Sequence, residues 1–178
     1  QEDAVRRCSS AGYDCEKIAI EKLKHFVSKD AFNIEGFGKK IVEKFWNLNL
    51  IKLPQDIFNL DFNEIESLEG WGRQSIENLK YSINQRKNIS LERFIYSLGI
   101  RHIGLENAKI IAKNLKSLKN FVELSKKNNF KDLINIDGIG ETQINSIKNF
   151  FKNDTNLDVL ENLEKVLNVK NAEIKKTN

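Results

Sequence analysis

The chain has 178 residues, of which 40% are hydrophobic and 30% charged, and its formal net charge is +4. This length fits one or two domains, and the mild positive charge is compatible with phosphate-bearing partners without indicating one. No apolar run approaches the ~20 residues of a membrane helix, and the polar N-terminus lacks the apolar segment of a signal peptide. Only two cysteines occur, which argues against a disulfide scaffold and favours a reducing, cytoplasmic compartment.

Apolar residues recur at helical spacing along most of the chain, and only residues 2–7 suggest a strand. Asp61, Ser90 and Ser117 are expected to begin helices, and Pro54 marks a break. A polar stretch at 126–129 is expected to separate two helical units, and residues 171–178 to form a frayed end or linker. The expected segments are a helix over 18–27, a first unit over 29–50, helices over 73–86, 118–124 and 157–167, and a junction between pairs of units at 87–90.

Four short glycine hairpins recur at nearly constant spacing. Their first positions, residues 36, 70, 102 and 138, lie 34, 32 and 36 residues apart, and a fixed period of this size is typical of repeat architectures. Each hairpin has an apolar middle residue, follows an apolar helical stretch and precedes an amphipathic helix. This is the helix-hairpin-helix pattern, and it predicts an all-α fold of four tandem motifs in a compact arc. The hairpins are Gly36-Phe37-Gly38, Gly70-Trp71-Gly72, His102-Ile103-Gly104 and Gly138-Ile139-Gly140.

The helix after each hairpin begins with amide N–H groups that have no intrahelical partner. Together with the positive end of the helix dipole these amides suit an anion, and glycine lets another backbone approach closely. Such contacts bind duplex DNA through its phosphates without reading sequence. The alternative is that the glycines only end helices in a structural scaffold. The residues predicted to bind DNA are Gly36, Gly38, Lys39, Lys40, Gly70, Gly72, Arg73, Arg101, His102, Gly104, Gly138 and Gly140.

Individual hairpin residues qualify this prediction. Lys39, Lys40 and Arg73 lie in the first turn of the helices that follow hairpins one and two. Their positive charge there is slightly unfavourable because it opposes the helix dipole, and an approaching phosphate would offset this cost in free energy. Hairpin four has Glu141 at the matching position, so we expect it to bind weakly or only to pack. His102 either contacts phosphate or merely tolerates an unusual turn. Trp71 is expected to be a core anchor in preference to a minor-groove wedge.

Several segments closely resemble the bacterial NAD-dependent DNA ligases. In that family a four-cysteine zinc finger precedes a helix-hairpin-helix domain and a BRCT domain. The resemblance implies domains at 1–28 (the end of a zinc finger and a connecting helix), 29–154 (helix-hairpin-helix) and 155–178. It also implies a parent monomer that uses NAD and zinc, encircles nicked DNA and acts in DNA replication and repair. The segments are 4–8 (AVRRC), 23–28 (LKHFVS), 34–38 (IEGFG), 91–101 (LERFIYSLGIR) and 136–140 (IDGIG), together with Cys15.

The chain lacks the family's Lys-x-Asp-Gly motif, whose lysine takes the adenylate, and it lacks the oligonucleotide-binding fold. It therefore resembles an internal, non-catalytic piece of a ligase that binds no cofactor alone. Cys8 and Cys15 are either half of a zinc site, with the other cysteine pair before Gln1, or two free thiols on a loose terminus. The alternatives for the function are a stand-alone repair or recombination accessory and a helical scaffold that binds no DNA.

Overall fold

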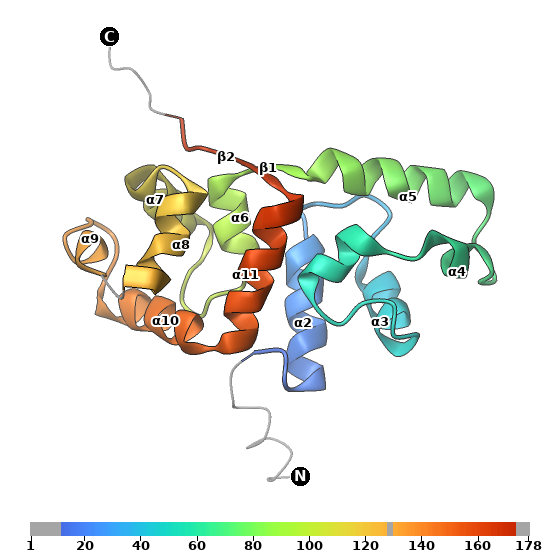
Figure 1. Cartoon of the computed structure of the whole chain (residues 1–178), viewed down its shortest axis with the longest axis horizontal. Helices are drawn as coiled ribbons and strands as arrows, with labels where there is room; N and C mark the ends of the chain where they lie inside the picture. Colours follow the sequence, from blue (N-terminus) through green and yellow to red (C-terminus); the bar gives the residue numbers. More distant parts are fainter. Residues whose placement is uncertain (1–11, 128–129, 174–178) are drawn as a thin grey trace. The chain divides into compact units, whose positions relative to one another are not determined.

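A computed structural model describes residues 12–127 and 130–173 and shows an all-α fold with one small sheet (Figure 1). The chain divides into two compact units, residues 1–87 and 88–178. The division falls in the segment predicted to join the two pairs of hairpins. The described elements are α2 (Glu16–Val27), α3 (Lys39–Asn47), the 3₁₀ helix η1 (Pro54–Asn59), α4 (Phe62–Glu66), α5 (Arg73–Arg86), β1 (Asn88–Ser90), α6 (Leu91–Ser97), α7 (Leu105–Leu115), α8 (Leu118–Lys127), α9 (Lys131–Ile134), α10 (Glu141–Lys152), α11 (Asp154–Val166) and β2 (Asn168–Lys170).

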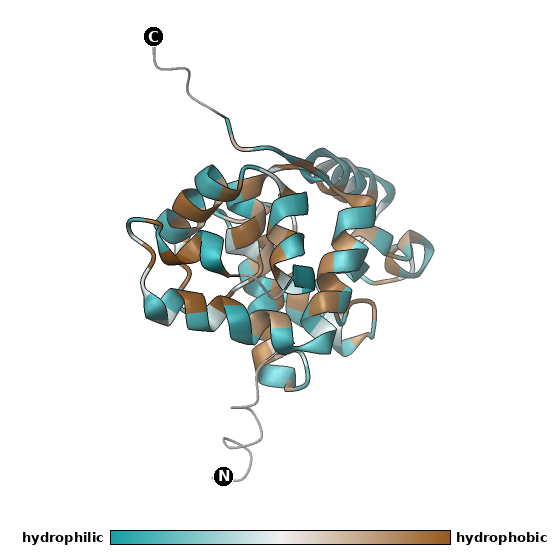
Figure 2. Ribbon diagram, turned by 60° about the vertical axis from the view of Figure 1, so that its left-hand side comes forward, coloured by the Kyte–Doolittle hydropathy of each residue, from teal (hydrophilic) through white to brown (hydrophobic). Residues whose placement is uncertain are grey.

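The helices are amphipathic, with apolar and polar residues alternating around each ribbon (Figure 2). The first unit buries a cluster of phenylalanines. Phe26 of α2 stacks on Phe32 with 4.2 Å between ring centroids, and Phe58 of η1 lies 5.7 Å from Phe32. All three rings are at most 9% exposed. Aromatic contacts of this kind hold the segment before hairpin one against the end of α2.

The second unit has its own core. Phe121 of α8 lies 5.3 Å from Phe151 of α10, and Phe94 of α6 is fully buried. A short parallel sheet joins the beginning and the end of the unit, because β1 pairs with β2 in the register Asn88 to Asn168 (Figure 1). Neither strand was predicted, since three residues are too few to show an alternating pattern.

Side-chain caps fix where several helices begin, as predicted from the sequence. The Asp61 carboxylate accepts hydrogen bonds from the amides of Asn63 and Glu64, at 3.1 and 3.2 Å, at the start of α4. Ser90 Oγ accepts from the amide of Arg93, and Ser117 Oγ accepts from the amide of Asn120. The predicted cap positions are therefore confirmed.

Two expectations about segments were wrong, and one alternative for a third does not hold. The stretch before hairpin one, residues 31–34, was expected to be helical, but α2 ends at Val27 and this stretch is a turn followed by irregular backbone. α8 continues through Lys127, with the cations Lys126 and Lys127 in its last turn, where positive charge is favoured by the helix dipole. Of the two alternatives for residues 171–178, a frayed end does not hold at 171–173, since the Ala172 amide donates to the Lys116 carbonyl at 2.9 Å, and a linker stays a prediction. The possible strand at 2–7 lies outside the described residues.

No helix in the described part of the chain is both long and apolar enough to cross a membrane. The predicted domain boundaries at 28 and 154 and the compact arc are not tested by these observations and stay predictions.

Candidate nucleic-acid interface

The four hairpins open with the same backbone turn. Their first residues all lie in the left-handed region, with φ of 80° at Gly36, 86° at Gly70, 64° at His102 and 90° at Gly138. In each turn the amide of the middle residue donates to the carbonyl three residues earlier, at 3.0 to 3.2 Å. Glycine adopts this conformation without strain, whereas His102 does so at some cost. His102 therefore lies in an unusual turn, and whether it also contacts phosphate or merely tolerates the turn stays untested.

The closing glycines have a different conformation and a different role. Gly38, Gly72, Gly104 and Gly140 are extended, and each is the N-cap of the helix that follows. The carbonyl of each accepts the amide of the residue four positions later, at 2.9 to 3.1 Å. The residues at that fourth position are apolar and buried: Val42, Ile76, Ala108 and Ile144.

Neither conformation nor internal packing requires glycine at three of these closing positions. The φ angles of Gly38, Gly72 and Gly104 are −84°, −115° and −81°, which any residue adopts. A Cβ built on these three residues would meet nothing within 4 Å. Valine or alanine at Gly38 or Gly72 would therefore meet no backbone strain. The fold therefore leaves space in which another molecule could approach the backbone at these three positions.

The hairpins differ in whether their closing amide is already occupied. Ser75 Oγ accepts from the Gly72 amide at 2.9 Å, and Gln143 Oε1 accepts from the Gly140 amide at 3.0 Å. Within the described residues the amides of Gly38 and Gly104 have no such cap. Each compact unit therefore contains one open hairpin and one whose closing amide is capped by its own helix.

Charges beside the hairpins differ as well. Hairpin one has Glu35 before it and Lys39 and Lys40 after it, and hairpin three has Arg101 before His102 and Glu106 after Gly104, all of them exposed. Hairpin two has Arg73 after it and Glu69 before it, both exposed. Hairpin four is acidic on both sides, with Asp137 before it and Glu141 after it. An anion would therefore be attracted most to hairpin one, where cations outnumber carboxylates, and least to hairpin four.

The middle residues of the hairpins lock the turns onto the helices that they join. Phe37, Ile103 and Ile139 are at most 6% exposed. Trp71 is only half-buried, with its ring centroid 5.8 Å from that of Phe45, so it is a core anchor in part. In unit 2, a Cβ on Gly138 would lie 2.8 Å from Ile110 Cδ1, so hairpin four is packed tightly against α7.

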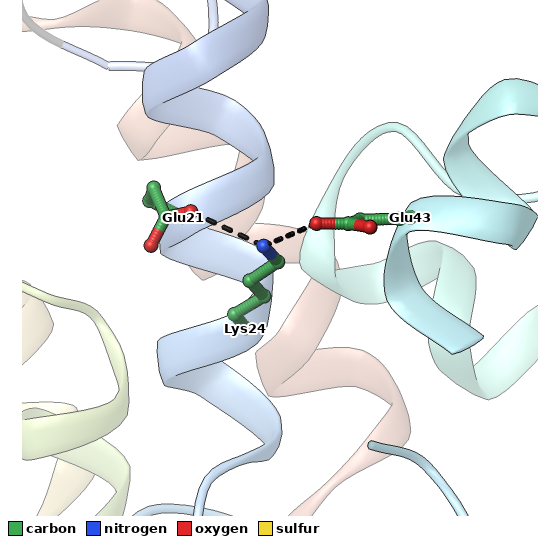
Figure 3. Close-up of polar contacts among 3 residues, drawn as sticks. All are labelled: Glu21, Lys24 and Glu43. Atoms are coloured by element: carbon green, nitrogen blue, oxygen red, sulfur yellow. Dashed lines mark hydrogen bonds and ion pairs between the residues drawn. The ribbon is translucent and has the colours of Figure 1, made fainter. Parts of the chain in front are cut away.

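An ion-pair bridge positions the helix that follows hairpin one. Lys24 Nζ of α2 donates to Glu43 Oε1 of α3 at 2.6 Å and to Glu21 Oε1 at 3.3 Å (Figure 3). The Lys24 side chain is 14% exposed. The hydrogen bond from Lys24 and its charge hold the pKa of Glu43 below its usual range, and the bond to Glu43 raises the pKa of Lys24. The pair therefore links α3, which bears Lys39 and Lys40, to α2.

The cysteine and histidine residues do not form a metal site within the described part of the chain, where no group of three or more His, Cys, Asp or Glu side chains could hold an ion. Cys8 lies outside the described residues. Cys15 is 7% exposed at the start of α2, and the described residues include no free cysteine, so the free-thiol interpretation of Cys15 was wrong. His25 lies in α2, as predicted.

Sequence reasoning missed the side chains that cap the hairpins. Ser75 and Gln143 stand three residues after the closing glycines, which is the position of the acceptor in a capping box. That spacing could have revealed them. Asn107 stands at the same spacing after Gly104, but its side-chain amide donates to the His102 carbonyl at 3.0 Å and does not cap the Gly104 amide.

The comparisons with known proteins agree with this geometry. Residues 93–160, which contain hairpins three and four, match the family model described as "Helix-hairpin-helix motif". The second unit therefore contains the helix-hairpin-helix motif, whereas the count of four such motifs in the chain stays a prediction.

The chain is also similar to bacterial proteins named DNA ligase. It is 67% identical over 172 residues to the DNA ligase of Pelagibacter ubique (strain HTCC1062), a match covering 97% of this chain and 25% of that protein. It is 42% identical over 180 residues to that of Rickettsia bellii (strain OSU 85-389), covering 94% of this chain and 26% of the relative. The chain thus spans about a quarter of the length of these relatives. The predicted resemblance is confirmed: over nearly its whole length, the chain is homologous to one segment of the DNA ligases.

Proposed function

We propose that the chain binds duplex DNA through backbone phosphates, without regard to sequence. The observation that carries the proposal is the open space above Gly38, Gly72 and Gly104, where neither the φ angle nor packing inside the fold requires glycine. The first amides of α3, α5 and α7 lie beside that space, at the positive ends of the helix dipoles. Phosphate oxygens accept hydrogen bonds from such amides. The relatives' name, DNA ligase, supports DNA as the partner.

Hairpins one and three are the principal phosphate sites in this proposal. Their closing amides are open, and the cations beside them, Lys39, Lys40 and Arg101, add charge attraction. Hairpin two contributes less, because a phosphate at the Gly72 amide must displace Ser75. Hairpin four contributes least, since Gln143 caps it and Asp137 and Glu141 repel phosphate.

In a parent ligase this segment would hold nicked DNA while other segments, which bind NAD, perform adenylate transfer and sealing during replication and repair. The 67% identity to a DNA ligase favours this role over that of a stand-alone accessory protein. The described residues do not by themselves make a zinc site. A zinc site that includes Cys8 and Cys15 would need ligands from elsewhere in a longer chain.

The proposal is tested by fluorescence anisotropy with labelled duplexes. Two intact duplexes of unrelated sequence and one nicked duplex are titrated with the chain at constant salt. We expect the two intact duplexes to bind equally within about twofold, because phosphate contacts carry no sequence information. Tighter binding of the nicked duplex would support the ligase role. A strong preference for one intact sequence, or binding to none of the three, would refute the proposal.

A further inference from the structure

A surface pocket of about 440 Å³ lies among α8, α9 and α10 of the second unit, and its lining includes no hairpin residue. Phe130 and Phe151 contribute to its apolar wall and are 7% and 6% exposed. Ile134 lines the same pocket and is 59% exposed. A single exposed aliphatic side chain is ordinary, but one that borders a hollow with aromatic walls offers a place for another apolar group.

Three lysines line this pocket. They are Lys131, Lys148 and Lys152, and the lining residues include no carboxylate. Lys148 Nζ lies 5.6 Å from the centroid of the Phe130 ring, so this ammonium group is held beside the apolar wall. The pocket therefore combines an apolar interior with a positively charged margin.

We propose that this lysine-rimmed pocket binds an acidic peptide segment of a partner protein that carries one apolar anchor side chain. The anchor would fill the hollow beside Ile134 and Phe151, and carboxylates on either side of it would face the lysines. Both features of the pocket are then used, because burial of the anchor supplies affinity and charge complementarity supplies orientation and speed of association.

DNA is a poorer occupant than a peptide. A phosphate backbone matches the lysines but has no apolar group to fill the hollow. Lys148 also stands eight residues after Gly140, or about 12 Å along α10 at 1.5 Å per residue, so a phosphate at the hairpin does not reach it. The proposal does not depend on DNA binding by the hairpins.

The test uses a fluorescein-labelled peptide of about twelve residues, made of Asp, Glu and Ser with one central Phe. We expect saturable binding to the chain by fluorescence anisotropy, and about tenfold weaker binding when the Phe is replaced by Ser. Ile134→Ser and Lys152→Glu are each expected to weaken binding at least fivefold. Both side chains are exposed, so these variants should fold, which circular dichroism checks. Lys113→Glu, which makes the same charge change at an exposed position on α7, is the control and should bind as the wild type does.

Three outcomes would overturn the proposal. The first is no saturation with the chain at about 1 mM. The second is equal binding of the Phe and Ser peptides, which would mean diffuse attraction between charges. The third is a loss of affinity for duplex DNA in Ile134→Ser as large as the loss for the peptide, which would make DNA the occupant of the pocket.

Discussion

Replacing the closing glycine of an open hairpin with alanine should weaken DNA binding while leaving the stability of the fold almost unchanged. In Gly104→Ala the new methyl group enters space that is empty to 4 Å, at a φ of −81°. Replacing glycine at a compatible φ stabilises by about 0.4–1 kcal/mol through the unfolded state, whereas alanine is a poorer N-cap than glycine. These effects oppose each other, so we expect the free energy of unfolding to change by less than about 0.5 kcal/mol.

DNA binding should respond differently. The methyl group would keep a phosphate at van der Waals distance from the N-cap, which lengthens amide–phosphate hydrogen bonds beyond their useful range. Loss of one charge-assisted hydrogen bond corresponds to about 1.4 kcal/mol, or about tenfold in affinity. Gly38→Ala should behave in the same way. The measurements are urea denaturation for stability and fluorescence anisotropy with a duplex for affinity.

Two controls make this experiment decisive. Gly138→Ala should lose stability by more than about 1 kcal/mol, because its φ is +90° and its Cβ would lie 2.8 Å from Ile110 Cδ1. The double variant Lys113→Ala with Lys126→Ala removes two exposed positive charges outside the hairpins. If this double variant weakens binding as much as a well-folded Gly104→Ala, the chain binds by diffuse charge and the reasoning is refuted.

Three further predictions concern other residues. His102→Gly should raise the free energy of unfolding by up to about 1 kcal/mol in urea denaturation, since glycine relieves the left-handed backbone; a clear loss would contradict this. Glu43→Gln should lower the melting temperature at neutral pH. Because Lys24 lowers the folded-state pKa of Glu43, that stabilisation is lost as the pH falls through the folded pKa, so wild type and variant should converge in acid. A persistent difference would mean packing and not charge. Metal analysis of the purified chain should give well under one zinc per chain, and one tightly held zinc would show that further ligands complete a site with Cys8 and Cys15.

The repeated elements of the fold could be predicted because their signals are local. Each hairpin lies within five residues, and the caps at Asp61, Ser90 and Ser117 depend only on residues two or three positions away. The strands β1 and β2 could not be predicted, because their pairing joins residues 80 positions apart. The partial exposure of Trp71 likewise depends on tertiary packing.

The sequence predicts which residues form the candidate site, but it does not predict which hairpins have an open closing amide. All four hairpins have nearly the same sequence pattern, so the pattern alone assigns them equal roles apart from Glu141. The distinction between open and capped amides arises from Ser75 and Gln143, whose side chains turn back onto the glycines. Which rotamer such a side chain adopts is decided by the folded turn and not by composition.

The salt dependence of DNA binding tests the central claim most directly. Phosphate contacts release condensed counterions, and each contributes about 0.9 to the slope of log K against log salt concentration. Roughly four to six contacts at the hairpins and their adjacent cations therefore predict a slope of about −4 to −5 for a duplex of any sequence. A slope near zero would contradict the claim that the hairpins bind the phosphate backbone.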